Sequence, residues 1–209
     1  MKKTLITILV ILGAYSATFA QQTKGDVELG IYAGFSYANV SGGGLVNADN
    51  KSGFNAGVAA DFYFSNRWSL KTKLIFDQKG WGDGFFSVEN SNNSNFKTDY
   101  RLNYITLPIM ANWHFGKKRN WYLNFGPYVG YLAGAKATDI STDVKDYFHN
   151  TDFGIAAGIG TKIRLSDNIK LLLEYDEQAG FTDIFKSNPG SAIRNGRASL
   201  NVGFNFILK

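Results

Sequence analysis

The sequence predicts an all-β fold, an eight-stranded antiparallel up-and-down β-barrel that crosses a membrane. Three observations predict it: apolar and polar residues alternate over long segments, the connections between these segments are short and long in turn, and glycine and aromatic residues are frequent. Of 209 residues, 23 are Gly, only 3 are Pro and 15% are aromatic. This composition is typical of a chain built from strands and turns.

The N-terminus, residues 1–20, has the pattern of a secretory signal peptide. Two lysines precede a short apolar core at residues 5–12, and small residues lead up to Ala20. The apolar core is too short for a spanning helix, which needs roughly 20 apolar residues. We therefore expect cleavage after Ala20 and a single mature barrel domain, residues 21–209.

The clearest alternation lies in residues 104–115 and 121–135. In the first segment every second residue is bulky or apolar: Ile105, Leu107, Ile109, Ala111, Trp113 and Phe115. Strands of 12 to 15 residues are longer than most soluble strands and suit a tilted passage through a bilayer. The polar run 116–120, with a tryptophan on either side, is the expected hairpin turn.

Six further segments alternate in the same way. In chain order the eight predicted strands are residues 27–37, 54–64, 68–77, 104–115, 121–135, 153–165, 169–178 and 198–208. One face of each is bulky and apolar, and the other is small or polar. We place the bulky face toward lipid, since small and polar side chains fit a narrow barrel interior.

The connections predict the topology. They alternate between short turns (65–67, 116–120 and 166–168) and long polar loops (38–53, 80–100, 136–152 and 179–197). Short periplasmic turns and long extracellular loops are typical of outer-membrane barrels. An even number of strands with both chain ends on the turn side closes the barrel and leaves no sheet edge in lipid.

The predicted inward face carries five acids and five bases: Glu28, Asp61, Lys71, Lys73, Asp77, Lys162, Arg164, Lys170, Glu174 and Asp176. An eight-stranded barrel is just wide enough for side chains to fill. Because buried charges must be paired, the balanced signs predict an ion-pair network that plugs the lumen. A selective conduction path is the alternative.

Aromatic residues near the strand ends predict two girdles at the membrane interfaces. The set beside the turns is Trp68, Trp113, Phe115, Trp121 and Tyr122, and the set toward the loops is Trp81, Phe85, Phe86, Tyr100, Tyr131 and Phe153.

Two prolines, Pro108 and Pro127, fall inside predicted strands. Pairing Phe115 with Trp121 across the hairpin makes the prolines diagonal neighbours. Since each removes a backbone donor from a closed sheet, we expect a β-bulge or local widening there.

Candidate catalytic and metal-binding residues are few. The chain has no Cys and two histidines, His114 and His149, and no serine-hydrolase motif. Its acidic loop clusters at 49–51 and 139–146 do not match a calcium loop. We predict no enzyme activity and no catalytic, metal or cofactor site. Removing the two signal-peptide lysines from 22 basic residues leaves 20 against 17 acids, too small an excess to indicate nucleic-acid binding.

Three segments carry a family resemblance: YITLPIMANWHF (104–115), FGPYVGYLAGAK (125–136) and DFGIAAGIGTKI (152–163). They resemble recurrent segments of the PorT-like small outer-membrane barrels, the porin-family or outer membrane protein beta-barrel domain, and the resemblance covers nearly all of the mature chain. It implies a Gram-negative cell envelope, an outer-membrane location and insertion by the barrel-assembly machinery. The chain departs from outer-membrane strands that finish on an aromatic residue, since it ends in Leu208 and Lys209.

Three functions fit the pattern. The first is an integral outer-membrane barrel with a structural or surface-interaction role, whose partners are the bilayer and a protein at the long loops. The second is a narrow diffusion pore or a secretion or transport accessory, as the PorT resemblance implies. The third is a soluble periplasmic lipocalin-like ligand-binding barrel, which would bury its apolar face inward.

Overall fold

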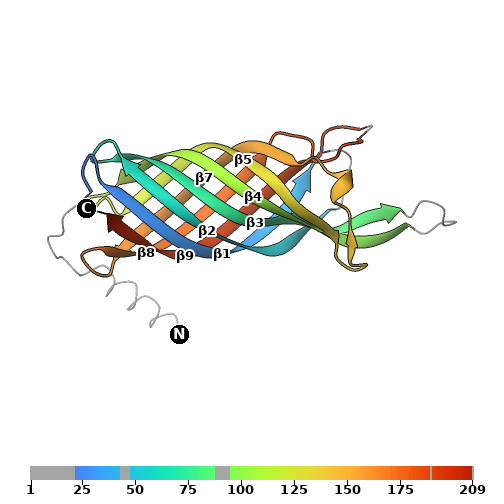
Figure 1. Cartoon of the computed structure of the whole chain (residues 1–209), viewed down its shortest axis with the longest axis horizontal. Helices are drawn as coiled ribbons and strands as arrows, with labels where there is room; N and C mark the ends of the chain where they lie inside the picture. Colours follow the sequence, from blue (N-terminus) through green and yellow to red (C-terminus); the bar gives the residue numbers. More distant parts are fainter. Residues whose placement is uncertain (1–21, 43–47, 88–94, 189, 209) are drawn as a thin grey trace.

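A computed structural model describes residues 22–42, 48–87, 95–188 and 190–208 (Figure 1). The side chains of 85–87 and 95–96 are also outside the description. The predicted signal peptide, Met1–Ala20, lies outside the described residues. No helix in the described part of the chain is long and apolar enough to span a membrane.

Eight long antiparallel strands form a closed barrel, as predicted. They are β1 (Val27–Ser41), β2 (Asp49–Tyr63), β3 (Trp68–Ser87), β4 (Asn95–Phe115), β5 (Trp121–Ala137), β7 (Thr151–Arg164), β8 (Ile169–Gly180) and β9 (Arg194–Leu208). A two-residue strand, β6 (Thr142–Asp143), and a 3-10 turn, η1 (Lys145–Tyr147), lie in the third long connection. Pairing of β1 with β9 and of β4 with β5 closes the ring.

The strand registers set the shape of the barrel. Pairs followed around the ring from Asp77 on β3 lead back to Arg67, ten residues earlier and immediately before the same strand. In an eight-stranded barrel such a stagger goes with strands tilted by roughly 35–45° and an interior just wide enough for side chains.

The faces of the strands are oriented as the alternation predicts. Leu107 and Val58 are 38% and 51% exposed on the outer wall, whereas Asn112 is fully buried inside. Short turns lie at one end of the barrel, the turn end, and long connections lie at the other, the loop end. The strands β3 and β4 continue beyond the other strands at the loop end as a projecting hairpin (Figure 1). The predicted loop 80–100 is therefore largely strand.

The girdle prediction is only partly correct. Trp68, Trp113 and Trp121 are exposed near the turns, and Tyr131 and Phe153 are exposed toward the loops. Three predicted girdle residues, Tyr122, Trp81 and Tyr100, are instead buried inside the barrel. Tyr122 faces inward because it pairs with inward-facing His114, and Trp81 pairs with Tyr100. The side chains of Phe85 and Phe86 lie outside the description.

The predicted hairpin register is confirmed, but the predicted β-bulge at the prolines is wrong. Phe115 pairs with Trp121 and Pro108 with Tyr128, in one register on both sides of the prolines. Ladder pairs are missing beside each proline, yet the register shift of this hairpin lies farther up, between Asn103 and Tyr104.

The reason lies in the residue next to Pro127. A Cβ at Gly126 would overlap the carbonyl oxygen of Ile109, so the strands approach closely without inserting a residue. The hydroxyl of Thr72 donates to the carbonyl oxygen of Pro108 at 3.0 Å. A side chain therefore supplies a hydrogen bond where the ladder is interrupted.

Candidate functional site

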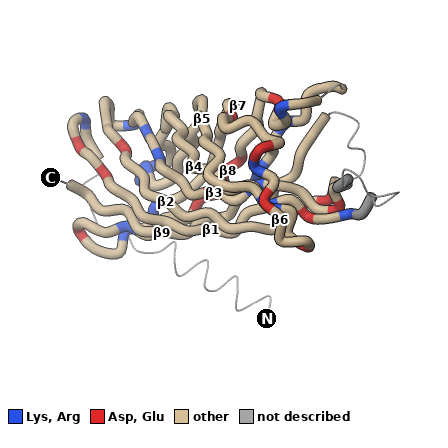
Figure 2. Tube along the Cα trace, turned by 45° about the vertical axis from the view of Figure 1, so that its right-hand side comes forward, with Lys and Arg blue, Asp and Glu red and all other residues tan. Residues whose placement is uncertain are grey.

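The barrel interior, or lumen, holds the chemistry-bearing residues. Among the described residues, twelve charged side chains are buried there, six acids and six bases: Glu28, Asp61, Asp77, Asp152, Glu174, Asp176, Lys71, Lys73, Lys79, Lys162, Lys170 and Arg197. We call this set the lumen network. Each member forms an ion pair with a member of opposite charge. Figure 2 shows both signs interspersed along the chain.

Nine of the ten predicted inward charges belong to the network. Arg164 shares the inner face of β7 with Lys162 and pairs with Lys170 in the register, but it is not part of the network. Arg164 lies where β7 enters a short turn, and its guanidinium pairs with the exposed Asp167 at 2.9 Å. Lys79, Asp152 and Arg197 were missed, because one predicted strand ends two residues before Lys79 and two others begin one residue after Asp152 and Arg197. The alternation that places Asp77 inside continues to Lys79, so extending the predicted strand by two residues would have found this lysine.

Glu28 and Asp61 organise the part of the network nearest the turns. Lys162 reaches both carboxylates, at 2.8 Å from Asp61, and Lys170 pairs with Glu28. The amide of Asn112 donates to Asp61 at 2.8 Å. This layer joins β7 and β8 to β1 and β2 across the lumen.

The structure brings Ser69 and Asp61 beside His114, a grouping that the sequence does not reveal. The Ser69 hydroxyl donates to Asp61 at 3.0 Å and lies 3.1 Å from the His114 Nε2. In a hydrolytic triad the histidine stands between the serine and the acid. Here the serine stands between them, and all three side chains are buried. The other histidine, His149, lies in the loop between η1 and β7.

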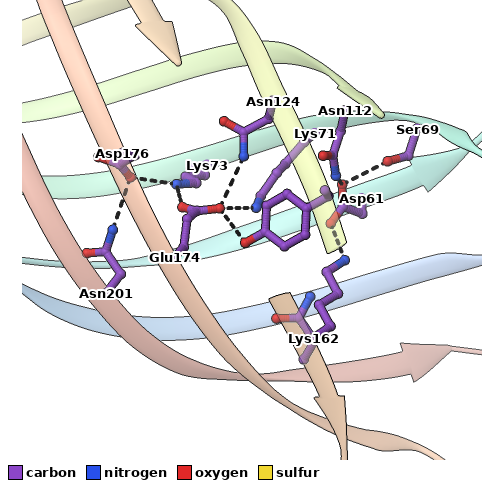
Figure 3. Close-up of polar contacts among 12 residues, drawn as sticks. Asp61, Ser69, Lys71, Lys73, Asn112, Asn124, Lys162, Glu174, Asp176 and Asn201 are labelled. Atoms are coloured by element: carbon purple, nitrogen blue, oxygen red, sulfur yellow. Dashed lines mark hydrogen bonds and ion pairs between the residues drawn. The ribbon is translucent and has the colours of Figure 1, made fainter. Parts of the chain in front are cut away.

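Glu174 is the centre of the middle layer (Figure 3). Its carboxylate pairs with Lys71 at 2.6 Å and also with Lys73. It accepts hydrogen bonds from the Tyr122 hydroxyl at 2.6 Å and the Asn124 amide at 3.1 Å. Every oxygen of this buried carboxylate thus has a charged or polar donor, as a buried charge requires.

The layer nearest the loops contains three carboxylates. Arg197 joins Asp77, at 3.1 Å, to Asp176. Farther up, Asp152 pairs with Lys79 at 2.9 Å and accepts hydrogen bonds from the side chains of Tyr128 and Asn195.

Some of the ion pairs join strands on opposite sides of the lumen. The strand order places β3 opposite β8 and β2 opposite β7. The pairs of Lys71 with Glu174 and of Lys162 with Asp61 join these opposite strands. Side chains therefore occupy the full width of the barrel at two levels.

Above the lumen network, buried apolar side chains form a cluster at the loop end that we call the apolar cap. Its buried members are Val40, Trp81, Tyr100, Leu102, Tyr104, Leu132, Ala135, Ala137, Val144, Phe148, Ile184 and Ile193, with Ala48 and Phe185 packed against them. The rings of Trp81 and Tyr100 stack 4.6 Å apart, and those of Phe148 and Phe185 are 4.8 Å apart.

Backbone hydrogen bonds join the two loops that supply the cap. The amide of His149 donates to the carbonyl of Ile184 at 2.8 Å, and that of Lys186 donates to Tyr147 at 3.0 Å. Phe148 and Phe185 form an antiparallel bridge between these contacts. The loops before β7 and after β8 are thus held together over the barrel mouth.

Asp183 holds the second of these loops in shape. Burial would raise the pKa of this carboxyl, but hydrogen bonds from the Asn188 amide and from the backbone N–H groups of Phe185 and Ile193 keep its pKa below the ordinary value. Both backbone donors belong to residues whose side chains contribute to the apolar cap.

In the described part of the chain, no three His, Cys, Asp or Glu side chains are placed so that they could hold a metal ion. The two acidic loop clusters of the sequence have other contacts. Lys51 pairs with Asp99 at 2.6 Å, and Asp139 accepts the backbone N–H of Asp99.

Comparison with known proteins gives a consistent result. The family described as "Outer membrane protein beta-barrel domain" matches residues 19–186. The outer membrane protein OprG from Pseudomonas aeruginosa has a similar fold, with a TM-score of 0.55, 9% identity and coverage of 90% of this chain and 98% of OprG. The outer membrane protein AlkL in lipid bilayers gives a TM-score of 0.50, 13% identity, and coverage of 93% and 95%. No curated protein sequence matched the chain.

Proposed function

Because the chain belongs to the outer membrane protein beta-barrel domain family and resides in the outer membrane, we propose that it is a sealed barrel with a structural or surface-interaction role. The observation that carries this proposal is the set of ion pairs that join opposite walls of the lumen. An open pore needs a continuous water path, whereas here charged side chains bridge the lumen and the apolar cap lies above them.

Conductance in planar lipid bilayers tests the seal. We expect the wild-type protein to show no steady ion current. The double variant Lys71→Ser, Glu174→Ser removes a bridge between opposite strands without leaving a lone charge, and it should conduct more than wild type. Steady current through the wild-type barrel would establish the narrow diffusion pore instead. A soluble periplasmic barrel is disfavoured because its outer wall carries exposed Leu107, Val58 and Phe125.

The proposed role is not catalytic. The Ser69, His114 and Asp61 group is buried, so a substrate in the membrane or the medium does not reach it. The proposal includes export with cleavage after Ala20, leaving residues 21–209 as the barrel domain, and insertion by the barrel-assembly machinery. Mass spectrometry of protein from outer membranes tests the cleavage site, and an intact N-terminus would refute it.

A protein partner at the loop end is part of the same proposal. The β3–β4 hairpin projects beyond the barrel, and its Lys97–Asp83 ion pair is exposed on both sides. A photo-crosslinker at Lys97 should capture the same partner repeatedly from intact cells. An equivalent crosslinker at Lys24, near the turn end, is the control.

A further inference from the structure

The outer wall carries a small polar cavity of about 350 Å³ at its loop end. It lies over β9, where the small residues Gly196 and Ala198 leave space on the outer surface. Tyr37 and Asn39 of β1 border it on one side, and Glu177 of β8 borders it on the other. The registers pair Tyr37 and Glu177 with the same residue, Ala198, so the two side chains face each other across one strand. Two larger depressions on the outer wall are lined mostly by apolar side chains.

The groups at this cavity are polar and mostly uncommitted. Asn39 and Glu177 are exposed, and no ion pair within the described residues involves Glu177. The hydroxyl of Tyr175 donates to Glu177 and fixes its carboxylate. An outward carboxylate with no cation is costly beside lipid, so a ligand with hydrogen-bond donors would stabilise it.

The chemistry of these groups selects the ligand class. Amides donate and accept hydrogen bonds, a carboxylate accepts them, and hydroxyl groups can do both. The one lining cation, Arg197, is buried and already paired with Asp77 and Asp176. A phosphate would therefore meet a negative cavity. The ring of Tyr37, 53% exposed, adds a flat apolar surface of the kind that covers the C–H face of a sugar.

We propose that this cavity binds a sugar of a glycolipid in the outer leaflet of the membrane. The cavity opens on the outer wall and not in the loops, so its ligand approaches from the bilayer. It also lies in the loop half of β1 and β8, toward the interface at which lipid headgroups begin. This site is independent of whether the lumen conducts.

Gly196 allows a selective test. A Cβ at this position would point at the Asn39 Oδ1, 2.8 Å away, so Gly196→Val fills the cavity and displaces a flexible side chain. The matched control is Gly134→Val on β5, where a Cβ meets nothing within 4 Å. A second variant, Tyr37→Leu, removes the ring and keeps an apolar side chain on the wall. Thermal unfolding in detergent checks that all three variants remain folded barrels.

The probes are purified lipooligosaccharide, the same molecule without its acyl chains, and phosphatidylethanolamine, each titrated onto the detergent-solubilised barrel and measured by native mass spectrometry. We expect wild type and Gly134→Val to bind intact lipooligosaccharide equally. Gly196→Val and Tyr37→Leu should bind it about tenfold more weakly, the effect of losing one or two hydrogen bonds or ring contacts.

Three results would overturn the proposal. The first is unchanged binding by Gly196→Val, and the second is equal binding of phosphatidylethanolamine, which carries no sugar. The third is loss of binding on addition of a chelator, which would assign Glu177 to a cation-bridged phosphate. Equal binding of the deacylated oligosaccharide would show that the ligand is a soluble sugar and not a membrane lipid.

Discussion

The lumen network and the apolar cap fill two parts of the same barrel with opposite kinds of contact. The network consists of ion pairs between residues on strands, such as Lys71 and Glu174. The cap consists largely of rings and aliphatic side chains, several of them from loops, such as Phe148 and Ile184. Buried ion pairs are favourable only in good geometry, and a closed sheet fixes that geometry. Apolar contacts have no direction, so they suit segments whose backbone is less constrained. The difference teaches that strands can hold side chains in the geometry an ion pair needs, whereas loops are better suited to apolar contacts.

The largest expected effect comes from breaking the network at its centre. Glu174→Gln keeps the size of the side chain but leaves Lys71 without its ion-pair partner and Lys73 with Asp176 alone. We expect a loss of about 3–5 kcal/mol in the free energy of unfolding, the range for an uncompensated buried charge. Urea titration in lipid vesicles measures it. The control, Asp167→Asn, breaks an exposed pair and should cost at most about 1 kcal/mol. Equal losses would mean that water solvates the lumen.

Truncating the cap should have a smaller and more local effect. Phe148→Ala removes a ring that is 1% exposed, and we expect a cost of about 3 kcal/mol, at the low end for such a change because loops can relax. Its neighbour Tyr147 is 65% exposed, so Tyr147→Ala is the control and should be nearly neutral. Hydrogen exchange should accelerate at 147–149 and 184–186 while the strands stay protected. Faster exchange along β8 as well would show that cap and network unfold together.

The smallest effect should come from pH. Since the pKa of Asp183 is lowered in the folded protein, its contribution is fully present above the unfolded value of about 3.9. It is lost as the pH falls below that value and through the folded pKa. We therefore expect the amides of 184–186 to lose protection below about pH 4, that is, to exchange faster relative to the unfolded chain at the same pH. Asp183→Asn separates this effect from titration of the lumen. In this variant the amides of 184–186 should exchange fast both above and below about pH 4. Identical profiles for the two proteins would exclude Asp183 as the cause.

Much of the barrel was predictable because its signals are local. Alternation fixed the faces of β4 and β5, and nine of twelve lumen charges followed from it. The apolar cap was not predicted, since Phe148 and Ile184 lie in polar loops where periodicity gives no orientation. Their apolar character was the available signal. The expected bulge at Pro108 and Pro127 failed because the effect of a proline depends on its neighbour across the sheet, here the close approach of Gly126 to Ile109.

The partners of the first and last strands have a consequence for the order of assembly. Among the described residues, Glu28 on β1 pairs with Lys162 and Lys170, and Asp77 on β3 pairs with Arg197 on β9. The cations that neutralise the early strands are thus synthesised last. A chain that ends before β9 leaves Asp77 without its cation, and an unpaired carboxylate resists transfer into lipid. The ion pair between Asp77 and Arg197 therefore requires the last strand.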